Sequence, residues 1–466
     1  MSIASSLYQP DVSSSVDSCI WIGLDFGTAT TECVVRVETR GMPDEVLIVA
    51  SSGLSRADSV VVIPSAVELD NGVMRTGIHL SGSGNLIDHF KLGLIEELEA
   101  SDTSLDLYRA DGPFAHALFH VASVIAMARG ALEKHLPGRK LGYYLNIAAP
   151  IGADPDNPAH QRVRHVFHEL AFRALELSNQ VQCWPVSEHN VESLLQQSLA
   201  VQVPGFDFSP VFVVPESLAA VTAFLHAPNR TAGNYAAIDV GGGSTDISFF
   251  WFQTGQYATT GEKRAWYYSI RSEPVGMSNL LNELRESIQA LDGRTQHERL
   301  RAIPSLSKHA HRESVRKLLA DVETTYKQAF RDCFLLRPNF ADWCDDGVGK
   351  WNLLLLGGGM SDNFIRDHLE DYTPHQMVKR HREVDSLGAP QDLNLMLPSG
   401  QILHYDPASL GRFEVDMLTK HSHMLTVAFG LSFRAPDIPR YGLESPVAPP
   451  KPPPPWEPSA HNVYLL

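Results

Sequence analysis

The chain has 466 residues, of which 44% are hydrophobic, so it is long enough to bury a large core and to form two to four domains or lobes. Its 38 basic and 54 acidic side chains give a formal net charge of −16, which argues against general binding to nucleic acids or anionic membranes. The five cysteines are odd in number and lack a C-x-x-C pair, which argues against a disulfide framework or a cysteine zinc site and favours a reducing compartment.

The first half of the chain predicts antiparallel strands followed by alternating helices and strands. Residues 1–19 are serine-rich and lack the pattern of a secretion signal, and no run of about 18 apolar residues follows, so we expect a flexible start and a cytoplasmic protein. Hydrophobic periodicity then predicts strands at 19–24, 32–37, 45–51 and 59–69, a helix at 113–136, a strand at 143–150, a helix at 158–178, a strand at 210–215 and a helix at 216–227.

The second half repeats this order more loosely. It predicts strands at 235–240, 246–252 and 264–270, a helix at 313–336, a strand at 351–357, a helix at 361–371 and a closing helix at 423–435. From Ser445 the composition becomes proline-rich, and residues 449–455 predict an extended polyproline II segment. Such a segment is either a stiff solvated tail or a ligand for an aromatic-lined groove of a partner.

A strand that runs into a glycine bend occurs three times, in "LDFGTAT", "IDVGGGSTD" and "LLLLGGGMSD". A hairpin turn would explain one of them, since glycine reaches positive φ at little cost. In the first two bends an aspartate, Asp25 or Asp239, precedes the glycines. Backbone amides in such bends can donate to phosphate oxygens, and the carboxylates can hold hydrated Mg²⁺. We therefore expect a nucleoside triphosphate, with the third bend suited to uncharged adenosine.

These motifs resemble those of the actin-like ATPase superfamily, which includes actin, the sugar kinases and the DnaK-type heat-shock chaperones. "IGLDFGTATTECVV" is similar to the first phosphate motif, "AAIDVGGGSTDISFF" to the second and "LLLLGGGMSDN" to the adenosine motif. The resemblance implies an α/β, two-lobed actin-like fold, each lobe built on a ribonuclease-H-like mixed sheet with flanking helices and the nucleotide in the interlobe cleft. It divides the chain into a flexible segment 1–19, lobe I at 20–229, lobe II at 230–412, a closing helix at 413–434 and a proline-rich tail at 435–466.

The chaperone branch of this superfamily is the most similar. "NIAAP" with "HQRVRHVFHELA" resembles the chaperones' proline-ended strand and Gln-Arg helix, "VVPESLAAVTAFL" their connecting helix, and "IDHFKLGL" the segment with their catalytic lysine. On that likeness Pro150, Gln161, Arg162, Glu216 and Lys91 carry over. The connecting motif reads "PES" where the chaperones have "NEP", and we expect no chaperone-type peptide-binding domain in the short region after Ala435.

The resemblance also implies a mechanism. Asp25 and Asp239 would organise Mg²⁺ through water, Lys91 would neutralise charge on the γ-phosphate, and Glu216 with Asp239 would position the attacking water. The phosphate contacts would be Gly27, Thr28, Ala29, Gly241, Gly242, Gly243 and Ser244. The adenosine contacts would be Glu313, Arg316, Lys317, Gly357, Gly358 and Gly359, although a solvated helix face explains the three charged residues equally well. Gly276, also expected to be a cofactor-binding residue, would match the turn glycine that precedes the subdomain with that helix.

Several functions are compatible with these residues. The first is a slow, Mg-dependent ATPase that acts as a chaperone-like conformational switch on an unidentified protein partner, reached through the proline-rich tail. The alternatives are an actin-like filament protein, a nucleotide-stabilised scaffold and a small-molecule kinase. A zinc site at His165, His168 and Glu169 lacks the H-E-x-x-H order, so we expect these histidines on the surface, as we do His421 and His423.

Overall fold

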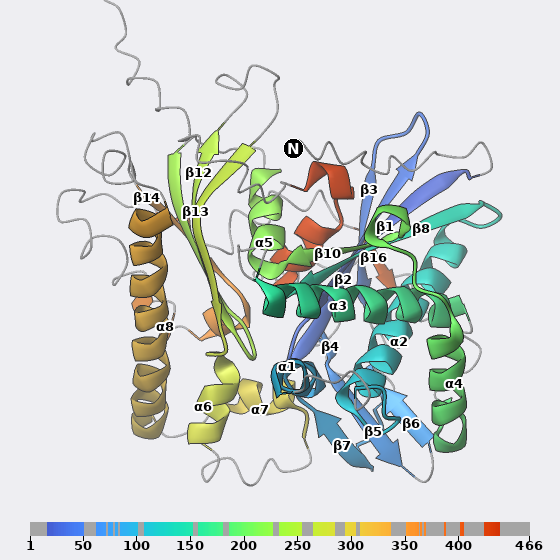
Figure 1. Cartoon of the computed structure of the whole chain (residues 1–466), viewed down its shortest axis with the longest axis horizontal. Coiled ribbons are helices and arrows are strands. Elements are labelled where there is room, and N and C mark those ends of the chain that lie inside the picture. Colours follow the sequence, from blue (N-terminus) through green and yellow to red (C-terminus); the bar gives the residue numbers. More distant parts are fainter. Residues whose placement is uncertain are drawn as a thin grey trace, which may run out of the picture.

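The computed structural model is a mixed α/β fold, as the sequence predicts, with two large mixed sheets that stand beside each other (Figure 1). It describes residues 16–50, 62–70, 73–77, 80–82, 84–100, 107–151, 157–179, 186–226, 233–253, 264–284, 294–303, 308–336, 351–362, 364–365, 368–369, 386–387, 401–404 and 424–438.

The first sheet has the strand order β10-β8-β1-β2-β3-β16, with β4 also paired to β2. Strand β1 pairs antiparallel with β2 and parallel with β8, while β2 and β3 are antiparallel and β8 and β10 are parallel. The strands are β1 Ser18–Phe26, β2 Thr30–Thr39, β3 Glu45–Ala50, β4 Ile63–Pro64, β8 Leu141–Ala149, β10 Val211–Pro215 and β16 Gln401–His404.

The second sheet has the order β13-β12-β11-β14-β15. Its first three strands are antiparallel and its last three are parallel, so it matches the order and directions of β3-β2-β1-β8-β10 in the first sheet. The architectural repeat in the sequence therefore has a structural counterpart. The strands are β11 Gly233–Val240, β12 Thr245–Gln253, β13 Arg264–Glu273, β14 Trp351–Leu356 and β15 Ser386–Leu387.

Alternation along the strands divides the core into layers. On β1, every second side chain from Ile20 to Phe26 is fully buried in a cluster with the helices α2 and α3. A second cluster joins the first sheet to the second through α5 and residues 424–431, and a third packs α8 on the far face of the second sheet. These helices are α2 Pro113–His135, α3 Pro158–Leu177, α5 Glu216–Leu225 and α8 Lys308–Leu336.

Helix α5 and the helix at residues 424–431 cross between the two sheets, and Gly430 lies at the crossing. Helix 424–431 lies against α5 so closely that a Cβ atom on Gly430 would overlap the carbonyl oxygen of Ala219. The same helix lies directly on β1, because a Cβ atom on Gly23 would overlap the carbonyl oxygen of Ala428. The side-chain amide of Asn146 donates to the carbonyl of Leu431 at 2.5 Å and holds the end of this helix on the first sheet.

Apart from β5, which overlaps the strand expected at 59–69, a small sheet and several short helices were not predicted individually from the sequence. Four antiparallel strands in the order β7-β5-β6-β9 form this small sheet at the bottom of Figure 1, next to α1 and α4. The elements are β5 Ala66–Asp70, β6 Val73–Thr76, β7 Asn85–Asp88, β9 Val186–Ser187, α1 Phe90–Ala100, α4 Glu188–Ala200, α6 Met277–Glu283, α7 Gln296–Ala302, η3 Phe206–Phe208, η6 Gly358–Ser361 and η7 Ala435–Asp437.

Three local predictions need correction. The strand expected at 59–69 is interrupted at Ser65, whose amide donates to the carbonyl of Ala29 and separates β4 from β5. Ser18 already pairs with Thr39, so the first strand begins inside the expected flexible segment. In the expected proline-rich tail, residues 435–437 form η7 and the next residue, Ile438, is buried, so this part of the tail belongs to the packed fold.

The polyproline segment 449–455 and both His421 and His423 lie outside the described residues. Helix α2 is long and apolar enough, by length and composition, to cross a membrane, but 89% of its apolar window is buried inside the fold. It is a core helix, packed against the first sheet and α3.

Candidate functional site

Two pairs of acids project from the faces of the sheets that are turned toward each other. Asp25 shares a face of β1 with Gly23, which lies under helix 424–431, and Asp239 shares a face of β11 with Ala237, which belongs to the cluster between the sheets. Directly paired residues of antiparallel strands lie on the same face. The register pairs Asp25 with Glu32 and Asp239 with Asp246, so four acids face the space between the two sheets.

The first two glycine bends touch each other. A Cβ atom on Gly242 would lie 3.1 Å from the backbone nitrogen of Ala29, and one on Gly243 would lie 2.5 Å from Oγ1 of Thr28. Side chains at these positions would therefore push the bends apart. The glycines are needed here for close approach of two backbones.

Helix α6 determines which way the peptide groups of the second bend point. The amide of Met277 donates to the carbonyl of Gly241 at 3.0 Å, and the amide of Ser278 donates to the carbonyl of Gly242 at 2.7 Å. In a trans peptide the next N–H points away from the carbonyl, so the amides of Gly242 and Gly243 point away from α6. No hydrogen bond from either amide to an acceptor occurs among the described residues. Oriented amides of this kind can donate to an anion.

A buried ion pair lies beside the acids. Nζ of Lys91, on the first turn of α1, donates to Oε1 of Glu216, the first residue of α5, at 2.5 Å. Lys91 is 4% exposed and Glu216 is 9% exposed. Burial lowers the pKa of Lys91, but the carboxylates of Glu216 and Asp25 outweigh it and the pKa is raised, so the lysine carries its charge.

The acids have raised pKa values because they are withdrawn from water and face one another. Burial, followed by Glu216, raises the pKa of Asp25 to about 7 and the pKa of Asp246 to about 8. Burial is also the main cause that raises the pKa of Asp239 and of Glu32 well above their usual range, and neighbouring carboxylates add to it. One lysine faces five acids, so the site has an excess of negative charge that protons or a cation must offset.

Glu32 and Asp246 were not assigned to the site from the sequence. The signal was present, since "DFGTATTE" and "DVGGGSTD" share the pattern D-x-G-x-x-[ST]-T-[DE] and end in these two acids. A two-strand hairpin places the first and last residue of this pattern opposite each other. Glu32 is 3% exposed, and its Oε1 has no hydrogen-bond partner within the described residues.

The donor set fits a cation that is held through water. Among the described residues no group of three or more His, Cys, Asp or Glu side chains is arranged to hold a metal ion directly. The surplus of carboxyl groups and the unpartnered Glu32 oxygen nevertheless favour positive charge near Asp25 and Asp239.

Of the histidines expected on the surface, His168 is instead buried, and it packs against Phe206. Burial lowers the pKa of His168 to about 4.

The third bend lies against the end of β11. Gly357 has φ of +85°, in the left-handed region that favours glycine, and a Cβ atom there would overlap a carboxylate oxygen of Asp239. Gly358 opens η6, and a Cβ atom on Gly359 would lie 2.8 Å from the Val240 side chain. The predicted adenosine motif therefore sits directly behind the second acid pair.

The remaining predicted contacts divide into two groups. Gly276 backs onto the second bend, since a Cβ atom on it would lie 2.8 Å from the backbone of Gly243 and Ser244. On the first turns of α8, Glu313 and Arg316 are exposed and 3.9 Å apart, and Lys317 pairs with Glu283 at 2.5 Å. This end of α8 reaches the third bend through a 2.6 Å bond between His311 and Asp362.

Of the residues carried over from the strand and the Gln-Arg helix, Pro150 lies at the site's end of the first sheet, whereas Gln161 and Arg162 do not belong to the site. Pro150 follows the end of β8 and lies at the same sheet edge as Asp25, because β8 runs parallel to β1. Gln161 and Arg162 are exposed on α3 and take no part in the buried cluster of acids and Lys91.

Neither a scan against protein-family models nor a search of curated proteins finds a match for this chain.

Proposed function

We propose that this chain binds ATP with Mg²⁺ between its two glycine bends, on a two-lobed fold of the actin-like ATPase type. The observation that carries the proposal is the second bend, whose Gly242 and Gly243 amides point away from α6 beside Asp239 and opposite Thr28. The matching strand orders of the two sheets and the repeated D-x-G-x-x-[ST]-T-[DE] pattern support it. In this reading the bends separate slightly to admit the phosphates.

The side chains around the bends divide the chemistry of phosphoryl transfer between them. The amides of the two bends hold phosphate oxygens, and the Lys91 ammonium offsets charge that develops on the γ-phosphoryl group. Glu216, already in contact with Lys91, orients the attacking water and accepts its proton. Asp25 and Asp239 would hold Mg²⁺ through water, and the ion would neutralise charge on the phosphates.

We further propose that nucleotide turnover moves the two sheets relative to each other and so controls a protein partner. Helices α5 and 424–431 cross between the sheets at Gly430, which makes this crossing the natural joint. Residues 449–455 are the proposed partner ligand. The partner would be captured differently in the ATP, ADP and nucleotide-free states, and equal capture in all three would refute the switch.

The first test is ATP binding and Mg-ATP turnover by the purified chain beside Lys91→Ala and Asp239→Ala. We expect slow turnover by the wild type, ATP binding without turnover by Lys91→Ala, and weakened binding by Asp239→Ala. Lys327→Ala, which removes an exposed lysine paired with Glu323 on α8, is the matched control and should behave as the wild type. Circular dichroism at the assay temperature verifies that each variant is folded.

The outcomes separate the candidate functions. Binding without turnover in every protein would favour a nucleotide-stabilised scaffold over an ATPase. Phosphate transfer to an added small molecule would favour a kinase, and ATP-dependent sedimentation would favour a filament. Failure of the wild type to bind ATP at all would overturn the proposal.

A further inference from the structure

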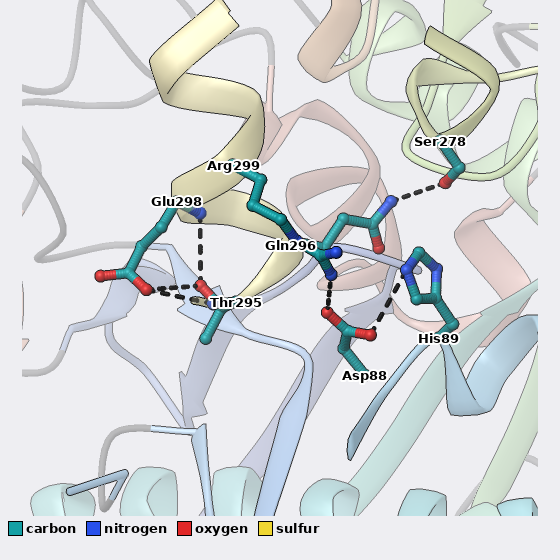
Figure 2. Close-up of polar contacts among 7 residues, drawn as sticks. All are labelled: Asp88, His89, Ser278, Thr295, Gln296, Glu298 and Arg299. Atoms are coloured by element: carbon teal, nitrogen blue, oxygen red, sulfur yellow. Dashed lines mark hydrogen bonds and ion pairs between the residues drawn. The ribbon is translucent and has the colours of Figure 1, made fainter. Parts of the chain in front are cut away.

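Helix α7 contacts two parts of the molecule that flank the proposed phosphate site. Figure 2 shows Arg299 of α7 directed toward Asp88, the last residue of β7, and the two side chains form an ion pair across 211 positions of sequence. The side chains are 25% and 14% exposed, so salt screens this pair less than a surface pair. Nε2 of His89 lies 3.3 Å from the other carboxylate oxygen of Asp88.

The Asp88 end of this contact leads to Lys91. His89 joins β7 to α1 with φ of +63°, a left-handed conformation that is unfavourable for a residue other than glycine. Its carbonyl accepts the hydrogen bond from Gly93 at 2.9 Å that opens α1. Such a conformation persists only where its surroundings hold it. The Asp88 carboxylate, anchored by Arg299, supplies such support to His89, which is two residues before Lys91.

A second residue of α7, Gln296, is linked to the second glycine bend. Nε2 of Gln296, which is 1% exposed, donates to Oγ of Ser278 at 2.6 Å. That hydroxyl donates in turn to the carbonyl of Gly242 at 2.5 Å. Because this peptide group also carries the N–H of Gly243, the chain of hydrogen bonds fixes the direction of an amide in the proposed phosphate site.

Helix α7 is itself held in place at its start. Thr295 and Glu298 form a capping box, in which the amide of Glu298 donates to Thr295 Oγ1 at 3.2 Å and the amide of Thr295 donates to Glu298 Oε2 at 3.1 Å. Gln296 and Arg299 are three residues apart and therefore lie on the same side of the helix (Figure 2). One turn of helix is thus linked to the bend through Gln296 and Ser278, and to the Lys91 segment through Arg299 and Asp88.

We infer that α7 is a strap that holds the Lys91 segment and the second glycine bend in register, and that the Asp88–Arg299 pair sets how long a nucleotide stays bound. This inference rests on the proposed nucleotide site. Asp88 and Arg299 act as positioning residues, because they act through His89, Lys91 and the bend. Breaking the pair releases the strap from β7 and lets the nucleotide leave faster.

The test is a charge-exchange series on the full chain. Release of a fluorescent N-methylanthraniloyl ATP, chased with unlabelled ATP in Mg²⁺, is timed for the wild type, Arg299→Gln, Asp88→Asn, Arg299→Lys and the exchange Asp88→Arg with Arg299→Asp. We expect Arg299→Gln and Asp88→Asn to release the labelled ATP about tenfold faster than the wild type. The release rates of Arg299→Lys and of the charge-exchange double variant should lie within about threefold of the wild-type rate. Arg271→Gln, which breaks a 2.9 Å pair with Asp332 inside the second half of the fold, is the matched control.

A second readout does not need a nucleotide. Hydrogen exchange of the backbone amides of α1 in the ligand-free protein should be faster in Arg299→Gln and Asp88→Asn than in the wild type and Arg271→Gln. If the wild type binds no nucleotide, the proposed function fails. The hydrogen-exchange rates of α1 then test by themselves whether the Asp88–Arg299 pair holds the Lys91 segment. If the nucleotide binds and leaves all variants at the wild-type rate, the strap as a determinant of release is overturned while the proposed function stands.

Discussion

Nζ of Lys91 lies 2.5 Å from Oε1 of Glu216, although 125 positions of sequence separate the two residues and both are buried. This pair joins the start of α1, the helix that follows β7 of the small sheet, to the start of α5, the helix that packs between the two large sheets.

Removing one member of this pair should cost more stability than removing both. Lys91→Met leaves a carboxylate buried without a partner, and we expect the free energy of unfolding to fall by about 3 kcal/mol. The double variant Lys91→Met with Glu216→Gln should lose less, because neither charge remains. Urea unfolding of the wild type, both single variants and the double variant measures this. A double variant that loses the sum of the single losses would show that the two side chains are not coupled.

The acid pairs predict that the ligand-free protein loses stability as the pH rises. Asp25 and Asp246 have an ordinary pKa of 3.8 and folded pKa values of about 7 and about 8, so the folded state binds more protons than the unfolded state between these values. The free energy of unfolding therefore falls as pH rises through this window. Asp246→Asn, which cannot ionise, should make the decline shallower.

Urea unfolding between about pH 5.5 and about pH 8.5, with a chelator present, measures this dependence as the difference between wild type and variant. The difference is used because the other titrating groups contribute equally to both proteins. An unchanged slope in Asp246→Asn would contradict the assigned protonation of this acid.

The crossing at Gly430 predicts a strict size limit. Gly430→Val would force the side chain into the backbone of α5 at Ala219, which cannot shift without moving the helix, and we expect a loss of about 3 kcal/mol. Gly205→Ala is the matched control, because no atom lies within 4 Å of a Cβ atom placed there. Thermal unfolding compares the two, and equal midpoints would show that the helices do not cross this closely.

The contact of the two bends predicts a selective loss of nucleotide affinity. Gly242→Ala would place its Cβ atom 3.1 Å from the nitrogen of Ala29, in the space between the bends that the phosphates are proposed to enter, so we expect about tenfold weaker ATP binding with less than about 1 kcal/mol of stability lost. Titration calorimetry and urea unfolding measure the two effects. An unchanged affinity would place the phosphates elsewhere.

Much of the fold was predictable because its signals are local. The alternation in "CIWIGLDF" and the helical spacing from Pro158 onward are set by neighbours in sequence, and both elements occur in the structure as β1 and α3. The small sheet was less accessible, because its strands are short and it pairs β6 with β9 across more than 100 residues of sequence. Weak local patterns of that kind gain their stability from tertiary contacts.

The sequence by itself determined the glycine bends, the acids that precede them and the candidate lysine, since each lies within a short stretch with a recognisable pattern. Only the tertiary structure decided that Lys91 pairs with Glu216 and that Arg299 reaches Asp88. A side chain's partner depends on how separate elements pack and on which face of a strand it occupies, and neither is encoded in the residues next to it.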